Sequence, residues 1–294
     1  MNPPRYLAPP TIAEAVRHLA EEGEGAYPLA GGTDLVVRMR AGLVQPTALV
    51  DLQRIPELAV IAVQDGRVWL GATVTLAKVV ASPELRRLTP VLAEAAAQMG
   101  AVQLRNLATV GGNLASAVPS ADLAPPLLVL DATARITGPA GERALPLEQF
   151  FAGPHRSVLR PGEILTGLEI PASDGGTGAA FLKFGRRSAQ VLAVVNAAAR
   201  VRLHRGVLDE VRIALGAVAP TPIRARSAEI LLRGAPPDRE RLDEAARLAA
   251  QEARPISDMR ATAGFRREIA QVLVRRALEQ AIRRAELEGL RHAL

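Results

Sequence analysis

Ala30-Gly31-Gly32-Thr33-Asp34 follows a short apolar stretch near the N-terminus, and a second glycine pair, in Thr109-Val110-Gly111-Gly112-Asn113, lies farther along the chain. Glycine lacks a Cβ and adopts positive φ readily, so successive backbone N–H groups in such segments can converge on one anion. Threonine, asparagine and aspartate can add side-chain hydrogen bonds. Together the two segments predict a diphosphate site. Ordinary tight turns are the alternative for each alone, because Gly-Gly is a common loop signal.

The spacing of the glycines excludes two familiar phosphate sites. A Rossmann dinucleotide site needs G-x-G-x-x-G between a strand and a helix, and a P-loop needs G-x-x-x-x-G-K-[ST]. Neither spacing is found in the chain. The second segment continues through Leu114 to Pro119-Ser120-Ala121-Asp122 and an apolar run at 127–130.

Three blocks in this order identify a family. Pro28-Leu29-Ala30-Gly31-Gly32-Thr33-Asp34-Leu35, Arg105-Asn106-Leu107-Ala108-Thr109-Val110-Gly111-Gly112-Asn113-Leu114 and Pro119-Ser120-Ala121-Asp122 resemble the FAD-binding medium subunit of molybdenum hydroxylases, the family of carbon monoxide dehydrogenase and xanthine dehydrogenase. Phe181-Leu182-Lys183-Phe184-Gly185-Arg186-Arg187 resembles the start of that family's C-terminal domain. The resemblance therefore covers nearly the whole chain.

The resemblance implies an α+β fold with two domains. Residues 1–176 would form an FAD-binding domain of the vanillyl-alcohol-oxidase (PCMH) type, with subdomains at about 1–58 and 59–176. Residues 177–294 would form a smaller C-terminal α+β domain of the carbon monoxide dehydrogenase flavoprotein type, with an antiparallel sheet and helices. The glycine-rich segment Asp174-Gly175-Gly176-Thr177-Gly178 is typical of a boundary between domains.

Residue patterns predict the individual elements. Thr11 and Glu14 form a capping box before a helical run, and Asp65-Gly66 is a hairpin signal between two apolar stretches. A strand, the first glycine segment, a helix and a strand should follow one another over 27–52. Two helical stretches, broken near Pro83 and Pro90, should occupy 75–100. Further strands are predicted at 127–130, 134–137, 164–170, 193–203 and 207–216, and further helices at 239–254 and 263–287.

The resemblance also assigns residues to FAD. The segment around Leu29, Ala30, Gly31, Gly32, Thr33, Asp34 and Leu35 would surround the pyrophosphate and ribityl chain, and Thr109, Gly111, Gly112 and Asn113 would face it. Asp122 and Lys183 would hydrogen-bond the cofactor, and Met99 and Leu165 would make apolar contacts. A helix-capping or turn role is the alternative for Asp122, and a plain core position is the alternative for Met99 and Leu165. Neither glycine segment contains His or Cys, so we expect FAD to be bound non-covalently.

Composition limits the chemistry that this chain can perform. It contains no Cys, hence no disulfide, no thiolate-ligated iron–sulfur cluster and no thiol nucleophile. Its four histidines have no paired spacing, so we predict no metal site. The net charge is +6, but arginines alternate with acids and aromatic residues make up only 3%, which argues against nucleic-acid binding. With no secretory signal and no membrane-spanning run, we expect a cytoplasmic protein.

The resemblance implies an oxidoreductase assembled from different subunits, through which electrons pass in sequence. A large subunit would carry molybdopterin, a small subunit would carry [2Fe–2S] clusters, and this chain's FAD would pass electrons to an external acceptor, in a dimer of heterotrimers. No residue of the chain is predicted to be catalytic. Some relatives place an aromatic residue over the flavin where this chain has Ser188-Ala189-Gln190-Val191, which leaves the acceptor open. The alternatives are a self-contained FAD-dependent oxidase or dehydrogenase of the vanillyl-alcohol-oxidase fold, and a scaffold that has lost flavin.

Overall fold

The computed structural model describes residues 3–172, 176–187 and 189–292. The chain folds into two compact units that alternate along the sequence. Unit 1 consists of Met1–Val79, Ala101–Ala117 and Ala132–Pro171. Unit 2 consists of Val80–Gly100, Val118–Asp131 and Ala172–Leu294. The predicted domain boundary near residue 176 stays a prediction, and Asp174 and Gly175 of its glycine-rich segment lie outside the described residues.

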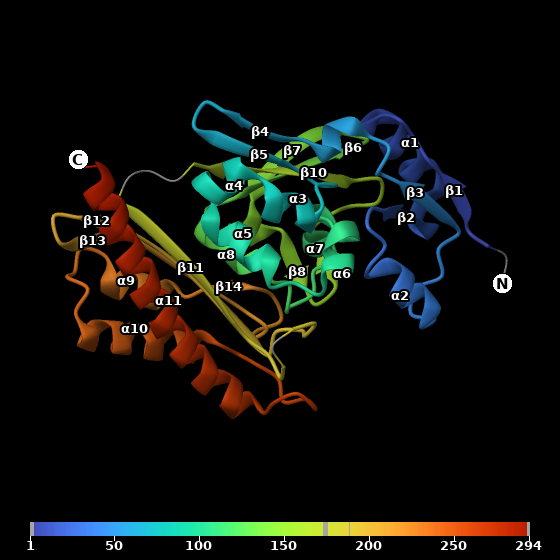
Figure 1. Cartoon of the computed structure of the whole chain (residues 1–294). Coiled ribbons are helices and arrows are strands. Elements are labelled where there is room, and N and C mark those ends of the chain that lie inside the picture. The colour runs from blue at the N-terminus through green and yellow to red at the C-terminus, as the bar shows by residue number, and fades with distance from the viewer. Residues whose placement is uncertain (1–2, 173–175, 188, 293–294) are drawn as a thin grey trace. The chain divides into compact units, whose positions relative to one another are not determined.

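Unit 1 contains two main sheets and several short helices (Figure 1). Its strands are β1 (Arg5–Leu7), β2 (Ala26–Leu29), β3 (Ala48–Asp51), β4 (Ile61–Gln64), β5 (Arg67–Gly71), β6 (Thr133–Gly138), β7 (Gly141–Pro146), β8 (Phe151–Gly153), β9 (Arg156–Ser157) and β10 (Ile164–Pro171). Its helices are α1 (Ile12–Glu22), η1 (Gly23–Gly25), α2 (Leu35–Arg40), η2 (Pro56–Ala59), α6 (Val102–Leu107), α7 (Val110–Ala115), η3 (Leu147–Gln149) and the beginning of α3 (Leu76–Ala81).

The N-terminal part of unit 1 is a parallel sheet with the strand order β1-β3-β2. Helix α1 begins after Thr11, whose hydroxyl accepts a hydrogen bond from the Glu14 backbone N–H at 3.2 Å, as the capping box predicts. Its apolar face packs against β3, and Val16, Leu19 and Val50 belong to one buried cluster. The predicted succession of strand, glycine segment, helix and strand over 27–52 is confirmed by β2, α2 and β3.

The second sheet of unit 1 is antiparallel, with the strand order β4-β5-β10-β6-β7. Strands β4 and β5 form the predicted hairpin, because Asp65 and Gly66 both have positive φ, at 50° and 69°. A two-residue turn with both central residues in this conformation matches the twist of the strands that it joins. Strand β10 lies at the centre of the sheet and carries an irregularity between Leu165 and Gly167.

Unit 2 is built on an antiparallel sheet with the strand order β11-β12-β13-β14. Its elements are α4 (Pro83–Leu88), α5 (Pro90–Ala97), α8 (Ala124–Val129), β11 (Thr177–Phe184), β12 (Val195–His204), β13 (Val207–Gly216), β14 (Ile223–Arg224), α9 (Arg226–Leu232), α10 (Arg239–Glu252) and α11 (Ala263–His292). Helix α11 runs along β11 and β12 (Figure 1). Gly178 permits this approach, because a Cβ there would lie 2.0 Å from the carbonyl oxygen of Ala281.

The two faces of the unit 2 sheet are covered by different helices. Ala197, Ala199 and Val201 of β12 belong to one cluster with buried residues of α9, α10 and α11. The alternate residues of a strand point to the opposite face, and contacts with α5 and α8 cover that face. The predicted hairpin sheet with helices is therefore confirmed. In the part of the chain that the structure describes, no helix is long and apolar enough to cross a membrane.

Some sequence-based element predictions are wrong. The predicted strand at 127–130 falls in helix α8, which begins with Pro125 and Pro126 in its first turn. Its residues are buried on every side, so the run lacks the periodicity that separates a helix from a strand. The region 75–100 holds α3, α4 and α5 rather than two helices, although Pro83 and Pro90 do begin α4 and α5. Helix α6, strands β7 and β11, and helix α9 were not anticipated.

Candidate functional site

The first glycine segment forms a loop, Ala30–Asp34, between β2 and α2, which we call the glycine loop. No described residue accepts a hydrogen bond from the backbone N–H groups of Gly31, Gly32, Thr33 or Asp34. The loop is half-buried, and Gly32 has a φ of +68°. Consecutive N–H groups without acceptors, around a residue of positive φ, are a feature of backbone anion sites. The glycine loop therefore provides the donor set that the sequence predicts for a phosphate.

The structure brings the two glycine segments together inside unit 1. A Cβ at Gly31 would lie 1.9 Å from the carbonyl oxygen of Leu107, at the end of α6, so only glycine fits there. The Ser116 hydroxyl, directly after α7, donates a hydrogen bond to Oδ2 of Asp34 at 3.2 Å. Position 31 must therefore be glycine because α6 leaves no space for a side chain, whereas glycine at position 32 allows the positive φ of the loop.

The second glycine segment forms the start of helix α7, so the alternative of an ordinary tight turn does not apply to it. Thr109 is the N-cap of α7, and its hydroxyl accepts a hydrogen bond from the Gly112 N–H at 3.1 Å. The Gly111 N–H donates to the carbonyl of Ala72 at 2.8 Å, and the Asn113 N–H donates to the carbonyl of Thr109. These backbone donors are occupied within unit 1, so this segment can offer a ligand little beyond its side chains.

One side chain of the second segment has no partner of its own. The side-chain oxygen of Asn113 is buried and has no hydrogen-bond partner among the described residues. The hydroxyl of Thr73 is also buried without a partner among the described residues. Thr73 follows Ala72, and a Cβ at Gly111 would lie 2.6 Å from the Cβ of Ala72, so Thr73 is close to the second segment. A buried polar atom without a partner is costly unless a ligand or water satisfies it. Asn113 is therefore the member of the second segment best able to bind a cofactor.

In unit 2, a buried ion pair joins two of the predicted site residues. The ammonium nitrogen of Lys183 lies 2.5 Å from Oδ2 of Asp122, and the two side chains are 5% and 7% exposed. Asn196, which is fully buried, donates from its side-chain nitrogen to Oδ1 of Asp122 at 2.8 Å. Lys183 and Asn196 lie opposite each other on β11 and β12, so they share one face of the sheet. A further contact joins the Lys183 ammonium to the carbonyl of Gln98 at 3.4 Å.

The surroundings of Asp122 exclude a helix-capping role and raise the pKa of its carboxyl. Helix α8 takes Leu123 as its N-cap, so Asp122 does not cap that helix. Burial raises the pKa of the Asp122 carboxyl, while the charge and hydrogen bond of Lys183 and the hydrogen bond from Asn196 oppose that rise. Sequence analysis did not single out Asn196. The available signal was a lone amide inside the apolar run 193–199.

The remaining predicted residues differ in how far they are buried. Leu165 is 4% exposed and pairs with Ile136 in the antiparallel sheet, as a core residue does. Met99 follows α5, is partly buried, and is the chain neighbour of Gln98. Leu29 and Leu35 flank the glycine loop and are half-buried, and a Cβ at Gly32 would lie 3.4 Å from Leu29.

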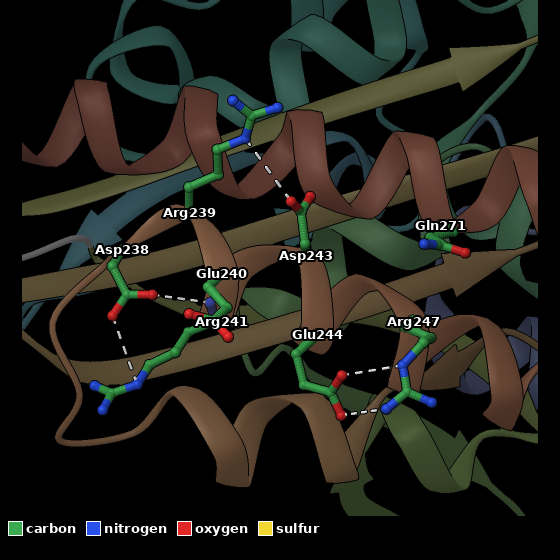
Figure 2. A pocket seen from close by; sticks show the side chains of 8 residues that line it. All are labelled: Asp238, Arg239, Glu240, Arg241, Asp243, Glu244, Arg247 and Gln271. Atoms are coloured by element: carbon green, nitrogen blue, oxygen red, sulfur yellow. Dashed lines mark hydrogen bonds and ion pairs between the residues drawn. The ribbon is translucent and has the colours of Figure 1, made fainter.

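A shallow hollow on unit 2 lies away from these residues in the sequence. It is lined by Asp238, Arg239, Glu240, Arg241, Asp243, Glu244, Arg247 and Gln271, of α10, its N-cap and α11. Figure 2 shows that its charged side chains pair along α10: Arg239 with Asp243, Arg241 with Asp238 and Arg247 with Glu244. These are the pairs expected on a solvated helix face. The hollow therefore adds no group directed at a ligand.

Comparison with known proteins identifies the family. Residues 2–173 match the FAD binding domain in molybdopterin dehydrogenase, and residues 179–281 match the CO dehydrogenase flavoprotein C-terminal domain. The chain belongs to the FAD-binding medium subunits of molybdenum hydroxylases.

Relatives within this family resemble the chain along its length. It is 35% identical over 281 residues to the carbon monoxide dehydrogenase medium chain of Afipia carboxidovorans, covering 96% of this chain and 97% of that one. It is 32% identical over 279 residues to the xanthine dehydrogenase FAD-binding subunit of Escherichia coli O157:H7, covering 94% and 95%. A solved carbon monoxide dehydrogenase chain from Hydrogenophaga pseudoflava matches with a TM-score of 0.94 at 35% identity, covering 97% and 99%.

The residues of this medium subunit fit the diphosphate of FAD. The N–H groups of the glycine loop have no acceptor among the described residues. The buried side-chain oxygen of Asn113 is an acceptor without a partner there, and a hydroxyl group of the cofactor's ribityl or ribose could donate to it. A diphosphate accepts several backbone hydrogen bonds at once, whereas a neutral ligand would leave most of those donors unsatisfied.

Proposed function

We propose that this chain is the FAD-binding electron-transfer subunit of a heteromeric molybdenum hydroxylase. The observation that carries the proposal is the run of N–H groups at Gly31, Gly32, Thr33 and Asp34 that have no acceptor among the described residues. The matching FAD binding domain over residues 2–173 supports it. When bound, FAD supplies the redox chemistry, and the protein binds and orients it.

We assign the cofactor contacts by chemistry. The backbone of Ala30–Asp34, flanked by Leu29 and Leu35, binds the diphosphate. Beside Thr109, Gly111 and Gly112, the Asn113 side-chain oxygen accepts a hydrogen bond from a hydroxyl group of the cofactor. In unit 2, the Lys183 ammonium has three donors, of which Asp122 and the carbonyl of Gln98 accept two. We assign the third to an oxygen of the cofactor. Met99 and Leu165 are assigned apolar contacts.

The partners follow from what the chain lacks. It has no Cys, so it cannot supply the thiolates that hold a [2Fe–2S] cluster. We propose that a small subunit holds these clusters and passes electrons to this chain, that a large subunit holds molybdopterin and the substrate, and that an external acceptor takes the electrons. A cytoplasmic dimer of heterotrimers, with an FAD-binding domain of the PCMH type in this chain, completes the proposal.

Anaerobic reduction of the isolated chain tests this assignment. The purified chain should bind FAD that heat releases, yet carbon monoxide, purines, aldehydes and N-heterocycles should not bleach the flavin. Adding the cluster-bearing and molybdopterin-bearing subunits, together with their substrate, should restore bleaching. A chain that binds no FAD would be a scaffold. Rapid flavin reduction in the isolated chain by an alcohol, amine or hydroxy acid would instead identify a self-contained oxidase.

A further inference from the structure

The first residue of the glycine loop, Ala30, accepts a hydrogen bond from a side chain that lies just after the neighbouring strand β3. Gln53 lies two residues after β3, and its side-chain nitrogen donates to the carbonyl oxygen of Ala30 at 2.5 Å. Leu29 and Asp51 are paired at the ends of β2 and β3, so the two parallel strands deliver Ala30 and Gln53 to the same edge. Gln53 is exposed, and hence the hydrogen bond is not a by-product of core packing.

The position of Gln53 is fixed by a second set of hydrogen bonds. Its backbone N–H donates to Oδ1 of Asp51 at 2.9 Å. The hydroxyl of Tyr6, on β1, donates to the other oxygen, Oδ2, at 2.5 Å. Asp51 is only 8% exposed, so its carboxylate is held by the sheet and both of its oxygens are occupied. The sheet β1-β3-β2 therefore determines where the Gln53 side chain begins.

The contact with Ala30 orients the first donor of the loop. The Ala30 carbonyl and the Gly31 N–H belong to one trans peptide, in which the two groups point in opposite directions. While Gln53 holds the carbonyl, the Gly31 N–H must face away from Gln53, where no described residue accepts it. Rotation of this peptide is otherwise easy, because the residue that follows it is glycine.

We propose that Gln53 is a positioning residue for the FAD diphosphate, which acts by fixing the Ala30–Gly31 peptide with its N–H group toward the phosphate. The inference rests on the proposed function of the glycine loop. It assigns Asp51 and Tyr6 a supporting role, since they hold Gln53 and do not touch the loop carbonyl.

Titration of the apo-chain with FAD tests the inference. Gln53→Met keeps the length of the side chain but cannot donate, and Gln53→Glu places a carboxylate against the Ala30 carbonyl. Gln53→Met should raise the dissociation constant for FAD roughly two- to twelvefold, the range for losing one hydrogen bond, and Gln53→Glu should raise it further. Tyr6→Phe should produce a smaller rise. Thr11→Ala, which removes a side-chain-to-backbone hydrogen bond elsewhere in unit 1, should lower thermal stability without changing FAD affinity.

The probes separate a positioning role from a structural one. ADP carries the diphosphate and should lose affinity for Gln53→Met by a similar factor, whereas riboflavin, which lacks it, should not. If wild-type apo-chain binds neither FAD nor ADP, the proposed function itself fails. If the wild type binds FAD and Gln53→Met binds it equally well, or loses riboflavin affinity to the same extent, the positioning role of Gln53 is overturned while the function stands.

Discussion

The Lys183 ammonium lies 2.5 Å from the Asp122 carboxylate, although the two residues are 61 positions apart in the chain. Both side chains are almost completely buried, and Asn196 donates to the second carboxylate oxygen. Removing two charges from water is expensive, and their attraction offsets this only when the remaining lone pairs are also satisfied. Asn196 meets that condition at Asp122. The contributions of Lys183, Asp122 and Asn196 to stability should therefore depend on one another.

A double-mutant cycle should reveal this interdependence. Lys183→Met alone should lower the free energy of unfolding by about 3–5 kcal/mol, because Asp122 is left buried without its cation. Combining it with Asp122→Asn should recover much of that loss, so the two effects should not add. Chemical denaturation of the four proteins measures the coupling. Arg247→Met, which removes an exposed ion pair with Glu244, should leave the free energy of unfolding almost unchanged. Strict additivity at Lys183 and Asp122 would contradict the interpretation.

An ion pair in unit 1 should make stability depend on pH. Arg143 donates to both carboxylate oxygens of Glu163, at 2.8 and 2.7 Å, and this hydrogen bonding holds the pKa of Glu163 below its ordinary value. A lowered folded-state pKa means that the stabilisation is complete above the unfolded pKa, about 4.3, and is lost as the pH falls toward the folded value. Glu163→Gln should therefore lower stability at neutral pH and flatten the acid limb of the stability profile. An unchanged acid limb, measured by urea unfolding from pH 7 downward, would exclude this pair as a source of acid sensitivity.

FAD binding should require glycine at position 32 for more than its positive φ, because a side chain there would also disturb the loop. Gly32 and Gly66 have nearly the same φ, +68° and +69°, so Gly→Ala should cost about 1–2 kcal/mol of backbone strain at each. At Gly32 the added Cβ would also lie 3.2 Å from the Val36 side chain and 3.4 Å from that of Leu29, so the loop must shift, and Gly32→Ala should raise the FAD dissociation constant roughly tenfold or more. Gly66→Ala, in the β4–β5 hairpin, should leave it unchanged. Equal FAD affinity in both variants, measured by fluorescence titration, would remove the diphosphate from the glycine loop.

Asn113 and Asn196 should respond to alanine in opposite ways. The Asn113 side-chain oxygen has no partner among the described residues, so Asn113→Ala should cost the apo-chain little stability yet weaken FAD binding by about 1–2 kcal/mol. Asn196→Ala removes a donor from buried Asp122 and should lower the melting temperature of the apo-chain. Thermal unfolding with and without FAD separates the two effects. A fall in apo-chain stability for Asn113→Ala would mean that its side chain serves the fold instead.

Local sequence was sufficient wherever the deciding interaction lies within a few residues. Asp65-Gly66 predicted the hairpin because both residues tolerate positive φ. Pro83 and Pro90 predicted breaks in the helical region, and helices α4 and α5 begin at them because the first turn of a helix does not need the N–H group that proline lacks. Strand β13 was predicted with its observed bounds, Val207–Gly216. The residue pattern of the glycine loop, with the family resemblance, likewise pointed to FAD, because backbone donors without side chains are a local property.

The tertiary structure alone decided which residues meet. Gly31 is required because the Leu107 carbonyl lies against it, and no pattern around residue 31 contains that information. The run 127–130 was mistaken for a strand because its residues are buried on every side, which leaves no periodicity to separate a helix from a strand. Lys183, Asp122 and Asn196 form one group because β11, β12 and the segment before α8 converge. Such pairings depend on packing between distant segments, whereas turns, caps and helix starts depend on the sterics of neighbouring residues.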